Sequence, residues 1–456
     1  MTMTGRPVPK IRPASAIAAA VRGQLVGPDR DVSGVFTDSR IVQAGSLFVP
    51  LIDERDGHDF IEAARSAGAV AWFTSKPAGA SGEIAVDDTA VALTEFGRVA
   101  RQELPERVIA VTGSSGKTST KDLLSAIFQQ EGPVAASEKS FNNEIGVPLT
   151  LVNAPRDAVG AVIEMGARGR GHIATLCAIA RPTVGIIVNI GTAHRELFGT
   201  AEGTADAKSE IYDAIGEMGA SVVNRDDALF ETMRARARGR VVCFSASGHR
   251  DALVVADQVS VDDEVRARFV LRTAWGDTAV RLGARGIHQV ENALAASAAS
   301  LVSGVSLEHV AAGLETTDLS PMRMDLQTGS SGVRVLNDSY NANPSSMRAA
   351  LLALSQMPAS RRFAVLGTMA ELGRDKLSYH LEIGAFARDL GITFTVALGE
   401  QDYGLVNVAS VDEVEAALGP LGEGDVVLVK GSRVAGLERV AEALLAHGSR
   451  REGPRP

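Results

Sequence analysis

The sequence predicts an α/β protein of three domains, and three observations lead to this prediction. The chain has 456 residues, and a domain of ordinary size has roughly 100–150. Short apolar runs of strand length alternate with helical patterns along most of the chain. Prolines interrupt this pattern near Pro105 and Pro321. We therefore expect domains at residues 1–106, 107–316 and 317–456.

Composition narrows the class of protein. Hydrophobic residues make up 45% of the chain, and 46 basic against 55 acidic residues give a net charge of −9. That charge, with only 4% aromatic residues, argues against a nucleic-acid-binding surface. Cys177 and Cys243 are far apart, which favours small buried side chains in a reducing compartment over a disulfide or zinc site. With no signal peptide and no apolar run of about 20 residues, we expect a cytoplasmic protein without stable membrane insertion.

The first segment, from about residue 12 to 104, predicts a small α/β domain. The apolar runs SLFVPL, AVAWF and EIAV alternate with helix-compatible stretches at 58–67 and 88–103. Two polar clusters, FTDSR (36–40) and DERDGHDF (53–60), are typical of turns and helix caps when judged by chemistry alone.

A candidate phosphate-binding loop opens the second segment, in VIAVTGSSGKTST (108–120). An apolar strand runs into Gly113 and the chain re-forms as a helix, so backbone N–H groups and a helix N-terminus face an anion. Lys117 would reach the outer phosphates of a nucleotide, and the Thr118 hydroxyl would bind Mg²⁺. Val111 stands where the general P-loop pattern has glycine, so a glycine turn without a ligand is the alternative. The strand–loop–helix context favours a P-loop ATPase-like central domain.

Polar residues follow two further predicted strands of this segment. Glu164 lies in the apolar run AVIEM (161–165), and His194 follows VGIIVNI (184–190). Ligands gather at the carboxyl ends of parallel strands, and a carboxylate there can bind magnesium. A capping glutamate and a structural loop histidine are the alternatives. Lys208 lies on a predicted helix, and by spacing alone it is interpreted as a solvent-exposed surface lysine.

The rest of the chain predicts two further structural units. Between 252 and 283, the alternating run RARFVLRT predicts an antiparallel insertion, and an alanine-rich helix follows. From VRVLND onward, strand runs alternate with helices to about residue 446, which predicts another mostly parallel α/β unit. NDSYNANPSSM (337–347) and VKGSR (429–433) place polar and basic side chains at strand ends. They suit a ligand or an anion, with an Asx-rich turn and a solvated helix start as the alternatives.

Taken together, these segments closely resemble the Mur ligases, the ATP-dependent amide-forming enzymes of peptidoglycan precursor synthesis. The resemblance is carried, in family order, by TDSR, DGHDFIEAA, VTGSSGKTSTKDLL, SFNNEIGVPLTL, EMGARGRGHIA, ARPTVGIIVNIGTAH, AKSEI, VENALAA, DSYNANPSSMRAAL, LGTMAELG and VKGSR. It implies an N-terminal domain for a uridine nucleotide, a central ATPase domain and a C-terminal Rossmann-like domain. It also implies ATP as co-substrate, Mg²⁺ as cofactor and an acyl-phosphate intermediate.

The resemblance implies a role for individual residues as well. ATP would be bound by Gly113, Ser114, Ser115, Gly116, Lys117, Thr118, Ser119, Asn292, Arg323 and Asp338. The metal ligands would be Thr118, Glu164 and Lys208, the last carbamylated by carbon dioxide. The catalytic residues would be Lys117, His194, Lys208 and Arg323. The substrates would be bound by Asp38, Ser39, Arg40, Asn142, Asn143, Tyr340, Asn341 and Lys430.

Residue choices within the family indicate the branch that adds D-alanyl-D-alanine to UDP-N-acetylmuramoyl-tripeptide. DSYNANP replaces the DYAHTP kind of loop of the ligases that add earlier amino acids, and the DNPR motif that reads diaminopimelate is absent. Thr368 stands where relatives often carry aspartate. Another ligase of this superfamily, such as folylpolyglutamate synthase, and a nucleotide-gated binding module are the alternatives.

Overall fold

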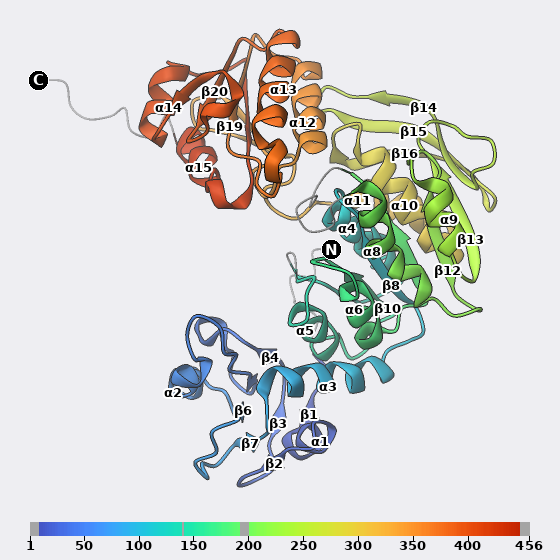
Figure 1. The fold of residues 1–456 in the computed structure, drawn as a ribbon, viewed down its shortest axis with the longest axis vertical. Helices are drawn as coiled ribbons and strands as arrows, with labels where there is room; N and C mark the ends of the chain where they lie inside the picture. Colours follow the sequence, from blue (N-terminus) through green and yellow to red (C-terminus); the bar gives the residue numbers. More distant parts are fainter. Residues whose placement is uncertain (1–8, 139–140, 192–199, 447–456) are drawn as a thin grey trace, which may run out of the picture.

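The structure is a computed structural model that describes residues 9–138, 141–191 and 200–446. Helices pack against sheets of five, nine and six strands that follow one another along the chain, with a further two-stranded sheet near the N-terminus (Figure 1). This confirms the predicted α/β class with several domains, while the boundaries at 106 and 316 stay predictions. Among the described residues, no helix has the length and apolar character that a membrane crossing needs.

The N-terminal sheet has the strand order β2-β7-β6-β5-β4, and only β2 runs antiparallel to its neighbour. Its strands are β2 (Gln24–Leu25), β4 (Val35–Phe36), β5 (Leu47–Phe48), β6 (Ala71–Thr74) and β7 (Glu83–Ala85). The short antiparallel pair beside it is β1 (Arg12–Pro13) and β3 (Asp31–Val32). The helices are α1 (Ala14–Ala20), α2 (Ile61–Ser66) and α3 (Thr89–Gln102), with 3₁₀ turns η1 (Ser39–Ile41) and η2 (Gly57–Phe60). Both predicted helical stretches are thus confirmed.

The central sheet has the order β16-β15-β14-β13-β12-β11-β8-β10-β9. Its first six strands are β8 (Val108–Thr112), β9 (Val134–Ala136), β10 (Gly160–Glu164), β11 (Val184–Ile187), β12 (Ala220–Asn224) and β13 (Arg240–Ser245). They run parallel to one another. The last three are β14 (Val254–Val261), β15 (Arg266–Thr273) and β16 (Gly276–Arg285). Each of these runs antiparallel to the next, which confirms the predicted insertion.

Helices cover both faces of the central sheet, which is why its inner strands are apolar throughout. Alternate residues of β8 point to opposite faces: Val108 and Ala110 join one core, Ile109 and Val111 the other. The helices of the first core are α5 (Gly146–Val152), α6 (His172–Ala180) and α8 (Ala201–Asp213), with α3 from the N-terminal part. The second core holds α4 (Lys117–Phe128), α10 (Gln289–Val302) and α11 (Leu307–Thr316). A short helix, α9 (Phe230–Arg236), follows β12.

The C-terminal sheet has the order β17-β18-β22-β19-β20-β21, and only β17 runs antiparallel to its neighbour. Its strands are β17 (Asp325–Thr328), β18 (Arg334–Asn337), β19 (Arg361–Leu366), β20 (Phe394–Leu398), β21 (Val406–Val408) and β22 (Asp425–Lys430). Its helices are α12 (Pro344–Gln356), α13 (Lys376–Asp389), α14 (Val411–Leu418) and α15 (Glu438–Ala446). The predicted mostly parallel sheet is confirmed. The edge strand β17 was not predicted, because its residues are half-buried or exposed and carry no apolar signature.

Candidate functional site

A pocket of about 770 Å³ lies where the loops after the central strands meet loops of the C-terminal part. The central strands β8, β10, β11 and β12 are parallel neighbours, so their carboxyl ends meet at one edge. The predicted site residues that line the pocket are Ser114, Ser115, Gly116, Lys117, Thr118, Ser119, Asn142, Glu164, Lys208, Asn292, Arg323, Asp338, Tyr340, Asn341 and Lys430. The fold therefore brings together residues more than 300 positions apart in the sequence.

The predicted phosphate loop is hydrogen-bonded to the end of the neighbouring strand. Asn189, just beyond β11, accepts hydrogen bonds from the Ser115 N–H at 3.0 Å and the Ser115 hydroxyl at 3.1 Å, while its carbonyl accepts one from Ser114 N–H. The apolar run was predicted to extend the strand to residue 190, but β11 ends at Ile187. Asn189, which lies beyond the end of β11, thus hydrogen-bonds to the predicted phosphate loop instead of extending the sheet.

Gly116 gives the loop its turn into α4. It has a φ of 77°, and a Cβ there would lie 2.2 Å from Oδ1 of Asn292. Gly116→Ala therefore strains the backbone and displaces Asn292, and we expect the dissociation constant for ATP to rise about tenfold or more, since such strain costs on the order of 1–3 kcal/mol. Calorimetric titration with a non-hydrolysable ATP analogue measures this. Gly216→Ala, at a glycine with open space around it, is the control, and equal affinities in both variants would contradict the prediction.

Two lysine amines share one backbone carbonyl beneath the loop. The Gly113 oxygen accepts a hydrogen bond from Lys117 Nζ at 2.9 Å and from Lys208 Nζ at 3.1 Å. Lys208 is 1% exposed. Burial, together with the charge of Lys117, lowers the pKa of Lys208 well below its ordinary value. Burial also lowers the pKa of Lys117. Burial and the neighbouring charge of Lys117 thus favour a neutral amine at Lys208.

The interpretation of Lys208 as a surface residue, made from spacing alone, is wrong. The residue lies on the buried face of α8, with Thr204 and Ala205 before it and Ile211 and Tyr212 after it. Those neighbours are spaced three to four residues away, as one helical face requires. This spacing was the available signal that a lysine pointed inward.

A buried carboxylate forms the centre of the pocket's polar network. Glu164 is 1% exposed and accepts hydrogen bonds from the Thr118 hydroxyl at 2.7 Å and from Asn142 Nδ2 at 2.8 Å. Arg323 Nη2 donates to the same Thr118 hydroxyl at 2.9 Å, and its guanidinium lies 4.3 Å from the centre of the Tyr340 ring. Asn142, predicted to contact substrate, thus orients Glu164.

These side chains fit a magnesium ion. The Thr118 hydroxyl and the Glu164 carboxylate are oxygen ligands, which magnesium prefers, and they already lie in hydrogen-bond contact. Among the described residues, the buried hydroxyls of Thr112 and Ser114 have no hydrogen-bond partner. Buried polar atoms normally have partners, so this edge of the sheet has groups suited to a further polar ligand such as a phosphate.

The C-terminal wall of the pocket is organised by an ion pair between the buried Lys430 and the partly buried Asp338. Lys430 Nζ lies 2.5 Å from Asp338 Oδ2 and donates to the Asn341 carbonyl at 3.0 Å. Asp338 also accepts a hydrogen bond from the Met324 N–H at 3.1 Å. Lys430 is 2% exposed, so its contacts hold the loop that carries Tyr340 and Asn341.

Some predicted residues lie elsewhere. Asn143 does not line the pocket, and its side chain accepts from Gly146 N–H at the start of α5 at 2.9 Å. Asp38, Ser39 and Arg40 are also absent from its lining; they lie at η1 in the N-terminal part, where Arg40 pairs with Asp38 at 2.6 Å. The predicted catalytic His194 lies outside the described residues.

Several pocket residues were not predicted. Asn224 is the last residue of β12, and Asp226 and Asp227 follow it. A polar cluster at the end of an apolar strand was the signal that would have found them. Glu291 accepts hydrogen bonds from Asn224 and Asn189 at 3.1 Å each, and burial raises its pKa. No pattern marked Glu291, because a glutamate in the first turn of a helix is ordinary.

Comparison with known proteins assigns the family. The Mur ligase middle domain matches residues 111–300, and the domain described as Mur ligase, glutamate ligase domain matches residues 322–433. The UDP-N-acetylmuramoyl-tripeptide–D-alanyl-D-alanine ligase of Mycobacterium tuberculosis is 40% identical in an alignment 476 residues long. This alignment covers 91% of this chain and 93% of that protein. The Escherichia coli protein of the same name is 35% identical over 95% of this chain and 98% of its own.

Solved structures agree with the sequence relatives. A crystal structure of MurF from Acinetobacter baumannii superposes with a TM-score of 0.85 at 31% identity and covers 96% of this chain and 99% of that one. The MurF ligase of Thermotoga maritima in complex with ADP superposes with a TM-score of 0.78 at 28% identity. It covers 92% of this chain and 98% of that one. The fold and the pocket define a P-loop nucleotide enzyme of several α/β domains. The chain belongs to the Mur ligase family, and it is an ATP-dependent ligase that forms an amide bond.

Proposed function

We propose that this chain joins D-alanyl-D-alanine to UDP-N-acetylmuramoyl-tripeptide at the expense of ATP, in the cytoplasmic synthesis of peptidoglycan precursors. The observation that carries the proposal is the convergence of Lys117, Glu164, Lys208 and Arg323 on one pocket. The chain that carries these four residues also aligns almost end to end with proteins named UDP-N-acetylmuramoyl-tripeptide–D-alanyl-D-alanine ligase.

The chemistry requires the donor carboxylate to be activated. A free carboxylate does not react with an amine at neutral pH, so phosphorylation by ATP first converts it into an acyl phosphate. Phosphoryl transfer depends on positioning and on neutralising phosphate charge. Lys117 and Arg323 supply positive charge, and the first turn of α4, from Lys117 to Ser119, supplies backbone N–H groups.

The metal and nucleotide ligands follow from the same network. Mg²⁺ would be held by Thr118, Glu164 and a carbamylated Lys208, where it neutralises charge on the phosphates. Asn292 of α10 and Asp338, just after β18, both line the pocket and would contact the nucleotide. Tyr340 and Asn341 would lie on the acceptor side.

The N-terminal part would bind the uridine nucleotide of the donor. We propose that residues 1–106 form this domain, 107–316 the ATPase domain and 317–456 the domain that completes the ATP site. Asp38, Ser39 and Arg40 would contact the nucleotide, since the exposed guanidinium of Arg40 lies on the N-terminal unit, outside the lining of the ATP pocket.

The test is an assay of ADP release together with mass analysis of the product. With the tripeptide nucleotide and ATP present, we expect sustained ADP release only when D-alanyl-D-alanine is added, with one amide product per ADP. ADP release at the same rate without acceptor, and no amide product, would contradict the proposal.

The acceptor is predicted to be a D,D-dipeptide rather than a single amino acid. The reason is the DSYNANPSSM loop, whose Tyr340, Asn341 and Ser345 line the pocket. Competition between D-alanyl-D-alanine, D-alanine and L-glutamate, read by product mass, measures the preference. We expect the dipeptide product to dominate, and incorporation of either single amino acid at an equal rate would overturn the assignment.

A further inference from the structure

Residues 317–324, here called the α11–β17 connection, join the central part to the C-terminal part and carry Arg323. Arg323 Nη2 donates to the Thr118 hydroxyl at 2.9 Å. Its Nε is a buried donor without a hydrogen-bond partner in the part of the chain that the structure describes. Buried donors normally have partners, so this guanidinium has capacity left for a phosphate oxygen. The course of the α11–β17 connection therefore decides where one positive charge of the pocket lies.

The backbone of this connection is unusual on both sides of Arg323. Met322 has a φ of 62° and Met324 a φ of 51°, in the left-handed region that side chains other than glycine rarely adopt. Such conformations persist where surrounding contacts hold them. The Met322 carbonyl accepts a hydrogen bond from Tyr340 N–H at 3.2 Å, and Met324 N–H donates to Asp338 at 3.1 Å. The connection is thus held from the C-terminal side.

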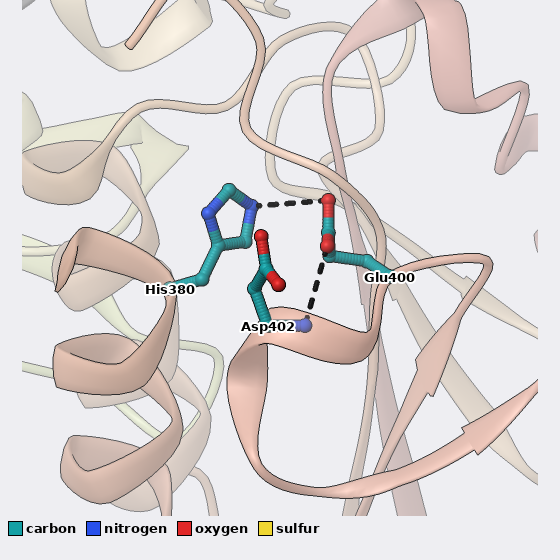
Figure 2. Close-up of side chains that lie close together, drawn as sticks. All are labelled: His380, Glu400 and Asp402. Carbon is teal, nitrogen blue, oxygen red and sulfur yellow. Dashed lines mark hydrogen bonds and ion pairs between the residues drawn. The ribbon is translucent and has the colours of Figure 1, made fainter. Parts of the chain in front are cut away.

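The C-terminal wall of the pocket is itself anchored at the loop after β19, residues 367–371 (Figure 2). The buried His380 accepts a hydrogen bond from Met369 N–H at its Nε2 at 2.9 Å. Its Nδ1 lies 2.7 Å from the carbonyl of the first residue of α13, which only an N–H at Nδ1 can satisfy. Glu400 and Asp402 lie beside the ring. Because backbone groups engage both ring nitrogens, this cluster is an anchor of the wall and not a metal site.

On the central side, the connection is held by Asp122 of α4. Ser320 N–H donates to Oδ2 of Asp122 at 2.8 Å, and the Ser320 hydroxyl donates to Oδ1 at 3.1 Å. The Asp122 side chain is 11% exposed, and its Oδ1 also lies 2.6 Å from Nζ of the buried Lys121. Hydrogen bonds to an ionised acceptor are stronger than those between neutral groups. A largely buried carboxylate with three donors therefore fixes the start of the connection.

Both contacts of the connection fall on one face of α4. Thr118 and Asp122 are four residues apart, so their side chains lie one above the other on the helix. Their partners in the connection, Arg323 and Ser320, are three residues apart. Asp122 and Ser320 do not line the pocket. Asp122 can therefore set the distance between the connection and Thr118 without touching a substrate.

We propose that Asp122 is a positioning residue for phosphoryl transfer: through Ser320 it docks the α11–β17 connection on α4 and so places the Arg323 guanidinium at the phosphate loop. This inference rests on the proposed function. Arg323 neutralises charge that develops on the phosphoryl group during transfer, so its misplacement lowers kcat more than it weakens the binding of ATP. The loss of Asp122 acts through Arg323, and not on the nucleotide directly.

The test is a double-mutant cycle between Asp122 and Arg323, read as the kcat of ADP release with both substrates saturating. In Asp122→Ala we expect kcat to fall about tenfold or more, since a displacement of about 1 Å can cost on the order of a hundredfold. The KM for ATP should stay within about threefold of wild type. In an Arg323→Ala background, Asp122→Ala should cost less than about twofold further, because the residue through which it acts is gone. Equal fold losses in both backgrounds would overturn the inference.

Two further variants separate positioning from stability. Ser320→Ala removes one hydrogen bond to Asp122 and leaves the pair with Lys121 intact; it should lower kcat about threefold or more, as the loss of a hydrogen bond to a charged group does. Wild-type kcat in Ser320→Ala would overturn the inference even if Asp122→Ala failed to fold. Ser306→Ala, which removes the N-cap hydrogen bond of α11 to His309 N–H, is the control and should keep the wild-type kcat.

The same assay distinguishes this inference from the proposed function. A wild-type protein that forms no amide product with D-alanyl-D-alanine would overturn the proposed function. Sustained amide formation by wild type, together with losses that simply multiply in the double variant, would overturn the role of Asp122 alone.

Discussion

Lys117→Ala is expected to remain folded and to lose at least about a hundredfold in the rate of ADP release, the scale on which removal of one preorganised charge contact acts. Lys117 is the first residue of α4, and its amine bends back to the Gly113 carbonyl inside the phosphate loop. Its ammonium is therefore held in place before the substrate binds. Alanine removes this positive charge from the place where negative charge would develop on the phosphoryl group during its transfer.

Initial rates of ADP release with both substrates saturating measure this effect, and thermal unfolding shows that the variant is folded. Lys10→Ala removes a lysine that pairs with Glu103 on the N-terminal part, and it should keep the wild-type rate. A folded Lys117→Ala protein with near-normal turnover would remove Lys117 from the catalytic residues.

Lys208→Ala is expected to be nearly inactive, because the buried amine would serve as a carbamate. Only a neutral amine reacts with carbon dioxide, and burial beside Lys117 lowers the pKa of Lys208 well below its ordinary value. More of the amine is therefore neutral near pH 7 than for an exposed lysine. Acidification protonates the amine, so carbamate occupancy and activity should both fall as the pH drops through the lowered pKa.

Removal of carbon dioxide should lower wild-type activity, and bicarbonate should restore it. A carbon-13 carbamate resonance after labelling with bicarbonate reports the modification independently of activity, and it should be missing from Lys208→Ala. Short carboxylates added to this variant should partly restore turnover, since they supply the missing oxygen ligand. Full activity in Lys208→Ala, or no labelled carbamate in wild type, would contradict the prediction.

The order of strands and helices was largely readable from the sequence because hydrophobic periodicity is a local property. The buried strands β8, β10 and β22 are continuous apolar runs, and β15 alternates as a strand with one exposed face does. The edge strand β17 escaped prediction, because its pairing with β18 depends on backbone hydrogen bonds rather than on buried side chains.

By itself, the sequence determined the α/β class, the phosphate loop around Lys117 and, through its resemblance to the Mur ligases, most of the residues that gather in the pocket. Only the tertiary structure decided how they act on one another. The packing of α8 against the sheet turned Lys208 inward to the Gly113 carbonyl, and the chain connection into β17 brought Arg323 to Thr118. The physical reason is that periodicity reports which face of an element is buried, whereas a contact between Lys208 and Gly113 or between Arg323 and Thr118 arises only when distant elements pack together.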